Sequence, residues 1–473
     1  MDPVGTWLSL LPPLVAIALA LATRQIYLSL FLGLWSATTL LAHGDPLDGL
    51  ARALEACVHV FADAGNTRVI LFSALIGALI AFTQVTGGVT GFVDAIARRR
   101  LVDTPARALL LSWLIGLVVF VESSITSLVN GAVCRPLFDK LRLSREKLAY
   151  LCDATAAPVC VLIPLNAWGA FITGLLAAEG FDQPVGLLVA ALPLNFYALA
   201  TLAFSLVVVV LLRRDFGPMA RAERRVRETG ELLRPGAVPV VAAELSDLAP
   251  APGTPPRARN FLLPMAVMVL MMPIGLTITG DGDPLRGSGS TSVLWAVLAA
   301  TAVAAGLGLA QRVLTFRATQ DLFFKGFGAL LPLALLMVFA FALGDLTKAL
   351  GTGAYVAQLA SSSLAPALLP AVVFLLGAAI SFSTGTSWGT FALMMPIALP
   401  AAAALGVPPA LAVGAVLSGG VFGDHASPIS DTTIIASMAA GTDHMDHVRT
   451  QLPYALVVGA ASLLAYLVAG LVA

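Results

Sequence analysis

Long apolar runs with almost no charged side chains are the feature of this sequence that most restricts its fold. A helix that crosses the hydrocarbon core of a bilayer needs about 20 apolar residues, and about a dozen segments of the chain approach that length. Only 11% of the residues are charged and 58% are hydrophobic, whereas soluble proteins carry roughly a quarter of charged residues. The sequence therefore predicts an all-α polytopic membrane protein in a lipid bilayer. The net charge of zero gives no indication of a nucleic-acid partner.

The apolar runs fall into two sets of six, separated by a polar stretch rich in proline and arginine. We expect the first set at 7–23, 26–42, 68–86, 106–138, 147–176 and 184–212. We expect the second set at 261–280, 292–312, 327–345, 367–404, 409–440 and 452–472. The same order of lengths recurs, which is typical of transporters built from internal repeats. We therefore predict a membrane repeat over 1–212, a cytoplasmic linker over 213–259 and a second membrane repeat over 260–473.

Each predicted repeat contains one run that is too long for a single crossing and is interrupted by polar residues. Glu122–Ser124 divides the run 106–138, and Thr384–Ser387 divides the run 367–404. Each half is short for a full crossing, so we expect two re-entrant hairpins with polar tips at mid-membrane. Irregular backbone at that depth is tolerated only where it lines a buried or wet cavity.

The run after each hairpin combines an acid, small polar residues and a helix-breaking proline. These residues lie at Asp153–Pro158 within 147–176, and at Gly423–Pro428 within 409–440. We therefore predict a broken helix in each repeat. Broken helices expose carbonyl and N–H groups at bilayer depth, and transporters use those groups as ion ligands.

Basic residues concentrate on one side of this topology. If a hairpin makes no net crossing, each repeat crosses an odd number of times, so the second repeat is inverted relative to the first. Lysine and arginine near membrane segments mark the cytoplasmic side. That side receives Arg24, Arg98–Arg100, Lys140–Lys147, the linker, and the group Arg312, Arg317 and Lys325. We therefore predict a cytoplasmic linker with both termini outside.

Several motifs group around the predicted tips and breaks. They are GDHASPISDTT over 423–433, DHMDHVRTQLPY over 443–454, GTSWGTF over 385–391, RPL over 135–137 and SREKLAY over 144–150. These motifs resemble the NhaC family of sodium/proton antiporters. The resemblance implies the fold of the ion transporter superfamily, a homodimer with scaffold and transport domains, elevator-type motion, and a place in the bacterial cytoplasmic membrane.

Four acids lie in the predicted tips and breaks, namely Asp424, Asp431, Asp153 and Glu122. An acid at bilayer depth tends to hold a proton because its ionised form is costly there, whereas a bound cation favours the ionised form. Sodium is a hard cation that binds oxygen ligands, so competition between Na⁺ and H⁺ for a carboxylate would produce exchange. The structural alternatives are helix caps for the three aspartates and a nearby basic partner for Glu122.

Neutral oxygen groups and one histidine are candidates to complete such a site. The candidate oxygen ligands are Ser123, Ser124, Thr155, Thr386, Ser387, Ser427 and Thr432. His425 follows Asp424 and would titrate near neutral pH, so it is a candidate pH sensor, with a structural hydrogen bond as the alternative. The string Asp443–His447 has the composition of a metal site, but its place between spans favours a polar connector. We expect no transition metal and no cofactor besides transported Na⁺.

The function that these features favour is Na⁺/H⁺ antiport by alternating access, and not catalysis. One alternative is sodium- or proton-coupled exchange of a small organic anion or amine, although no arginine lies in the predicted tips or breaks. A remote alternative is an intramembrane aspartyl protease, because two membrane acids could form an acid–base pair. Such proteases usually carry Gly-x-Gly-Asp, but here Val421 stands two residues before Gly423.

Overall fold

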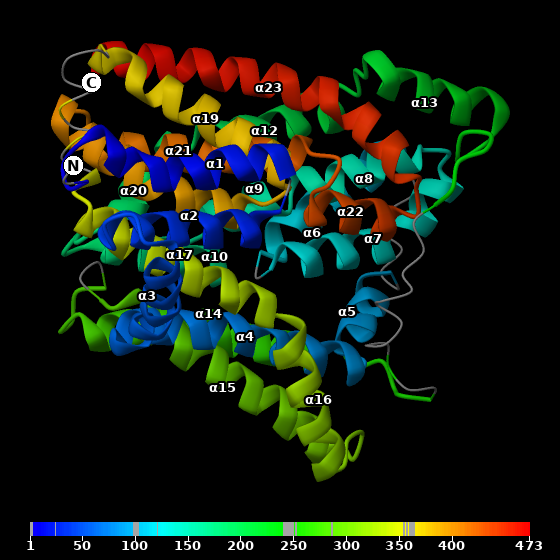
Figure 1. The fold of residues 1–473 in the computed structure, drawn as a ribbon. Helices are drawn as coiled ribbons and strands as arrows, with labels where there is room; N and C mark the ends of the chain where they lie inside the picture. Colours follow the sequence, from blue (N-terminus) through cyan, green and yellow to red (C-terminus); the bar gives the residue numbers. More distant parts are fainter. Residues whose placement is uncertain are drawn as a thin grey trace.

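The structure is a computed structural model, and it describes residues 3–23, 25–97, 104–120, 122–239, 250, 253–284, 287–352, 355, 358 and 365–473. Arg24 and Arg98–Arg100, which the predicted topology placed on the cytoplasmic side, lie outside these residues. The described residues form helices and loops with one isolated β-bridge, between Pro239 and Asp443. The expectation of an all-helical chain is confirmed (Figure 1).

The first half of the chain forms helices of very different lengths. They are α1 (Leu11–Thr23), α2 (Ile26–Leu41), α3 (Pro46–His59), α4 (Ala64–Val85), α5 (Gly88–Ala97), α6 (Pro105–Val118), α7 (Ser123–Lys140), α8 (Arg145–Ala154), α9 (Ala157–Leu162), α10 (Ala167–Ala178), α11 (Pro184–Ala191) and α12 (Phe196–Phe204). Short 3-10 turns cover Trp7–Leu10, Val60–Ala62 and Leu192–Leu194. A π-helical segment, Ser205–Leu211, continues α12.

The linker and the second half of the chain also form helices of different lengths. Their helices are α13 (Gly217–Thr229), α14 (Arg259–Thr279), α15 (Gly289–Ala310), α16 (Phe316–Ala329), α17 (Leu331–Ala349), α19 (Leu369–Thr384), α20 (Ser387–Leu405), α21 (Pro409–Ala426), α22 (Asp431–Ala440) and α23 (His444–Val472). A 3-10 turn, Pro366–Leu368, leads into α19.

The lengths and hydropathy of the helices agree with a membrane protein that crosses the bilayer many times. Within the described residues, six helices are long and apolar enough to span a membrane, and the number rises to nine if each of three bent helix pairs is one span. The six are α4, α14, α15, α19 with the turn before it, α20 and α23. The prediction of a multi-pass membrane protein is therefore confirmed.

Both predicted hairpins are pairs of helices joined by a short tip. Four residues separate α6 from α7, two separate α19 from α20, and the helices of each pair pack together. Gly385 in the second tip has a φ of 68°, in the left-handed region that favours glycine. A Cβ at Gly385 would lie 2.6 Å from the carbonyl oxygen of Ile429. The second tip therefore lies directly against the loop that separates α21 from α22.

Both predicted helix breaks are present, and the first half of the chain contains an additional bend. The second break falls where it was predicted, because α21 ends at Ala426 and α22 begins at Asp431. In the first half, only two residues separate α8 from α9, and the larger bend of 44° comes between Leu162 and Ala167. The side chain of Asn166 accepts hydrogen bonds from two backbone N–H groups and so starts α10 after this bend.

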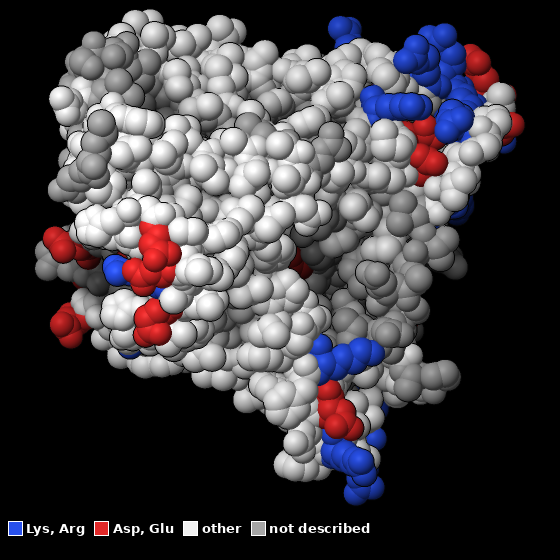
Figure 2. Space-filling model, viewed as in Figure 1, with Lys and Arg blue, Asp and Glu red and all other residues white. Residues whose placement is uncertain are grey.

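Charged side chains separate toward the two ends of the molecule. Figure 2 shows clusters of lysine and arginine over α13 and α16, and a cluster of aspartate and glutamate at the opposite end. Both chain termini lie at that opposite end (Figure 1). This separation is the pattern expected for a membrane protein whose basic loops share one side, while the inversion of the repeats stays a prediction.

Candidate functional site

The carboxylate of Asp424 lies at the second helix break and is held by hydroxyl groups from two other helices. Asp424 is in the last turn of α21 and is only 1% exposed. Its Oδ2 accepts a hydrogen bond from Ser387 Oγ at 2.6 Å, and its Oδ1 accepts one from Ser430 Oγ. Ser387 is the first residue of α20, and Ser430 is the N-cap of α22. The N-terminal ends of α20 and α22 therefore both lie beside this carboxylate.

Asp153 brings the first half of the chain to the same place. It lies in the last turn of α8 and is 0% exposed. Its Oδ2 accepts hydrogen bonds from Thr433 Oγ1 at 3.0 Å and from Gln451 Nε2 at 2.7 Å. The same Thr433 hydroxyl lies 3.5 Å from the backbone carbonyl oxygen of Asp424. One threonine thus connects the two buried acids, which are 271 positions apart in the sequence.

Gln451 on α23 joins both broken helices to a buried histidine. Its Nε2 also donates to the carbonyl oxygen of His425 at 2.5 Å, and its Oε1 lies 2.9 Å from His447 Nε2. The other ring nitrogen of His447 lies 2.7 Å from Ser437 Oγ. The Gln451 amide is fully occupied by these contacts, so it fixes the distance between α8 and the end of α21.

His425, the predicted pH sensor, lies in a buried aromatic environment beside the acids. Its Nδ1 lies 2.8 Å from the hydroxyl of Tyr197. The ring of Tyr150 lies 6.2 Å from that of His425, centroid to centroid. Within the described part of the chain, His425 Nε2 has no hydrogen-bond partner. His425 is therefore one buried ring with one satisfied and one unsatisfied nitrogen.

The remaining predicted residues serve their own helices or neighbouring backbone. Glu122 is the N-cap of α7, with Oε2 accepting from Ile125 N at 3.0 Å and Oε1 from Ser123 Oγ at 3.2 Å. Three hydroxyls contact backbone groups, and they belong to Thr155, Thr386 and Ser427. Thr432 reaches Asp424 indirectly, through a contact of 2.9 Å with Ser430 Oγ. The side chains of Ser124 and Asp431 lie outside the described part of the structure.

A profile of the Na⁺/H⁺ antiporter family matches residues 170–471. The chain belongs to this family. It is also 33% identical, over 98% of its length and 90% of the relative's, to an uncharacterised protein of Haemophilus influenzae. Shorter matches are to the arginine/ornithine antiporter ArcD of Halobacterium salinarum (30% identical, 45% of this chain and 42% of the relative) and to the Na⁺/H⁺ antiporter NhaC of Alkalihalophilus pseudofirmus (43%, 15% of each).

A solved structure supports the fold of this antiporter-family chain. The YdaH transporter of Alcanivorax borkumensis superimposes with a TM-score of 0.57 at 14% sequence identity, over 89% of this chain and 88% of that one. At that identity the likeness shows the fold alone. Together with the family match, it establishes a multi-pass secondary transporter, and the predicted resemblance to NhaC is confirmed.

Four residues of the acid cluster were not predicted: Ser430, Thr433, Gln451 and His447. All four lie inside the strings that carry the family resemblance. Their polarity in an otherwise apolar region was the available signal, because polar side chains in membrane segments usually face the protein interior. Spacing along the chain could not identify their partners.

The Asp443–His447 string holds the segment that follows α13, through Arg234 and Val238. Asp443 caps α23 and accepts a hydrogen bond from Val238 N at 2.9 Å, while Asp446 forms an ion pair with Arg234 at 3.0 Å. Burial alone would raise the pKa of Asp443, but backbone N–H donors and the Arg234 guanidinium hold that pKa below its usual range. Within the described residues, no three potential ligands gather into a metal-binding group.

Replacing Gln451 with leucine is expected to lower both exchange and stability. The substitution removes hydrogen bonds to Asp153, to the His425 carbonyl and to His447, and each buried polar group left unsatisfied costs about 1–3 kcal/mol. We expect exchange to fall about tenfold or more and the thermal unfolding midpoint to drop, measured in liposomes and in detergent. Gln183→Leu, at an exposed position before α11, is the matched control. Equal behaviour of the two variants would contradict the bridging role.

Proposed function

We propose that this antiporter-family protein exchanges Na⁺ for H⁺ at the cluster formed by Asp424 and Asp153. The observation that supports this most strongly is that the Thr433 hydroxyl contacts both the Asp153 carboxylate and the main-chain carbonyl oxygen of Asp424, at the break of α21. Each carboxylate is buried and receives hydrogen bonds from neutral donors. An isolated negative charge is costly in such a place. A proton removes that charge by forming a neutral carboxyl, whereas a bound sodium ion balances it.

Competition between the two cations for this cluster gives exchange without further groups. When a proton is bound, the carboxyl is neutral and tolerates burial. When Na⁺ is bound, the ionised carboxylate is a direct ligand, and the hydroxyls of Ser387, Ser430 and Thr433 rotate to offer their oxygen lone pairs. Because one carboxylate cannot hold both cations, binding of one from either side releases the other. Alternating access then makes the two movements opposite.

We further propose an elevator-type movement in a homodimer within the cytoplasmic membrane. The linker would lie in the cytoplasm and both termini outside. The lysine and arginine clusters over α13 and α16, opposite the termini (Figure 2), support this orientation. Glu122, Asp431 and His425 stay candidates for supporting roles in proton movement, with Glu122 also capping α7.

The test is direct transport by the purified protein in liposomes that contain a pH-sensitive dye and an imposed pH gradient. We expect Na⁺ pulses to dissipate the gradient and choline pulses to have no effect. If no alkali cation between pH 6 and pH 9 produced a response, sodium/proton exchange would have to be withdrawn. The membership of the antiporter family would stand.

A second candidate function is coupled exchange of a small organic anion or amine. It is supported by one relative, which is named an arginine/ornithine antiporter and aligns with 45% of this chain. Addition of such a solute would then stimulate Na⁺ or H⁺ flux, whereas pure cation exchange would be unchanged. The family supports a transporter rather than an enzyme, so an intramembrane protease finds no support here.

A further inference from the structure

A cavity of about 400 Å³ is lined by none of the residues of the acid cluster, and the mechanism above does not use it. The starts of α4 and α15 line it together with the last turns of α10 and a residue near the end of α17. Helix α13 lies at the opposite end of the molecule from α3, which leads into α4 (Figure 1). A volume of about 300–1,000 Å³ is usual for small-molecule sites, so this cavity is large enough for a small organic solute.

Charges of both signs line this cavity. Asp63 and Asp345 contribute two carboxylates, and Arg68 contributes a guanidinium. Among the residues that the structure describes, Arg68 forms no ion pair and no side-chain hydrogen bond. Its five N–H donors match a carboxylate in geometry. The cavity therefore contains a guanidinium that can bind an anionic group and two carboxylates that can bind a cationic group.

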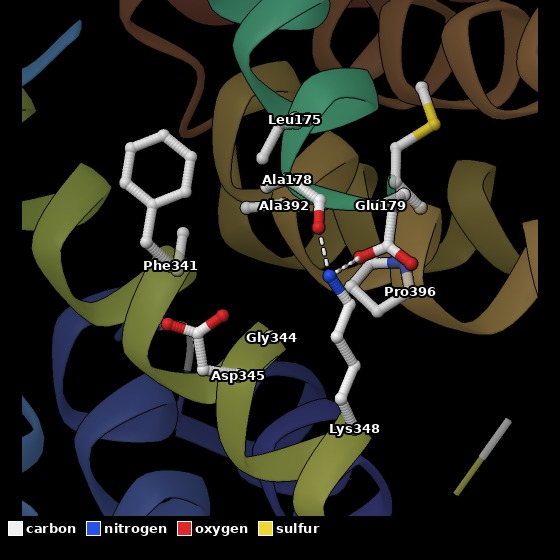
Figure 3. Close-up of a pocket in the computed structure, with 11 residues that line it drawn as sticks. Leu175, Ala178, Glu179, Phe341, Gly344, Asp345, Lys348, Ala392 and Pro396 are labelled. Atoms are coloured by element: carbon white, nitrogen blue, oxygen red, sulfur yellow. Dashed lines mark hydrogen bonds and ion pairs between the residues drawn. The ribbon is translucent and has the colours of Figure 1, made fainter. Parts of the chain in front are cut away.

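In a smaller neighbouring cavity, Lys348 forms its hydrogen bond and its ion pair with groups other than Asp345. Figure 3 shows Lys348 directed toward Ala178 and Glu179, while the carboxylate of Asp345 points into the space between α17 and α10. Lys348 Nζ donates to the carbonyl oxygen of Ala178 and lies 3.9 Å from a carboxylate oxygen of Glu179. Asp345 lines both cavities, so its carboxylate is available to a solute.

Neutral hydroxyl groups from α15 and its N-cap also line the cavity. Ser288 is the N-cap of α15, and Ser290 is in its first turn. Their hydroxyls lie 3.4 Å apart, and Ser290 Oγ lies near the start of α4, since a Cβ on Gly65 would lie 4.0 Å from it. Hydroxyls beside a guanidinium are the usual surroundings of a bound carboxylate.

We propose that this cavity binds a small organic solute that carries both a carboxylate and an ammonium group. Arg68 and the two serine hydroxyls receive the carboxylate, and Asp63 and Asp345 receive the ammonium. With two acids and one base, the lining carries one negative charge in excess, which favours a solute with an additional ammonium, such as a basic amino acid. This site is distinct from the acid cluster and does not rest on sodium/proton exchange.

The test uses the full-length protein in detergent and three related probes, with binding measured by calorimetry. L-lysine carries all of the required groups, cadaverine lacks the carboxylate, and 6-aminohexanoate lacks the second ammonium. We expect L-lysine to bind most tightly of the three. We expect Arg68→Gln to weaken L-lysine binding about tenfold or more, as loss of a charge-assisted contact does, and not to weaken cadaverine binding, because cadaverine has no carboxylate and Arg68 repels its ammonium groups. Asp345→Asn is expected to weaken both.

Two controls make each outcome decisive. Arg52→Gln removes an exposed arginine that pairs with Asp48 on α3, and it should leave L-lysine binding unchanged. Asp424→Asn should also leave it unchanged, which separates this site from the proposed exchange. The proposal is overturned if wild-type protein shows no L-lysine binding, if Arg68→Gln binds L-lysine as wild type does, or if cadaverine binds as tightly as L-lysine.

Discussion

Asp424→Asn is expected to reduce Na⁺-dependent proton movement to the level of protein-free liposomes. The amide cannot lose a proton and cannot offer a full negative charge to Na⁺, so neither half of the exchange can occur. The fold should survive, because an asparagine side chain has the same shape and can still contact Ser387 and Ser430. The measurement is dye-reported transport in liposomes, together with the thermal unfolding midpoint in detergent. Wild-type exchange in this variant would remove Asp424 from the site.

A second variant tests one of the proposed hydroxyl ligands, and it should weaken exchange without abolishing it. Ser387→Ala keeps the carboxylate but removes the donor at 2.6 Å. A single contact to a charged group contributes about 1.5–3 kcal/mol, so the Na⁺ concentration for half-maximal exchange should rise about tenfold or more. Ser9→Ala, a buried serine whose hydroxyl contacts the carbonyl oxygen of Thr6, is the matched control and should not change that concentration.

The sequence predicted the elements of the site because their signals are local. The tips and breaks interrupt apolar runs with glycine, proline and acids, so the helix ends at Thr384 and Ala426 follow from the chain itself. Scarcity of charge in the membrane then identified Asp153 and Asp424 as unusual. The predicted break at 153–158 is present between α8 and α9, with Pro158 in the first turn of α9, where proline is tolerated, whereas the bend between Leu162 and Ala167 was not predicted.

Contacts between distant segments could not be predicted in the same way. The hydrogen bond from Gln451 to Asp153 joins residues 298 positions apart, and that from Thr433 joins residues 280 apart. Periodicity reports which side of a helix is apolar, and it carries no information about which polar residue on another helix will face it. The linker shows the same limit. The sequence alone does not show that its charged residues pair with Glu146 and Lys147 on α8.

Lys147 is a buried cation that connects α13, the helix of the linker, to the neighbouring helices of the bundle. Its Nζ lies 2.8 Å from a carboxylate oxygen of Asp215 and 2.9 Å from one of Glu223, and the three side chains are 2–4% exposed. Tyr454 on α23 donates to the other oxygen of Asp215. The ion pair of Arg225 with Glu146 lies beside this group. Through these contacts α13 packs against α8 and α23, so this helix is a fixed part of the bundle.

Lys147→Met is therefore expected to be among the most destabilising substitutions in the chain. It keeps the length of the side chain but leaves two carboxylates buried without their cation, which costs about 3–5 kcal/mol. We expect a lower thermal unfolding midpoint and faster tryptic cleavage at Arg221 and Arg224 of α13, because cleavage of a docked helix requires local opening. Lys140→Met, at an exposed position at the end of α7, is the matched control.

A triple variant separates the effect of charge from that of packing. Asp215→Asn and Glu223→Gln in the Lys147→Met background remove the two stranded charges with little change in shape. Because breaking a buried ion pair is far more costly than replacing it entirely, the triple variant should regain most of the lost stability and tryptic resistance. If Lys147→Met behaved like Lys140→Met, or if the triple variant were less stable than the single one, α13 would be held by its apolar face, Met219 and Val226, and not by the buried charges.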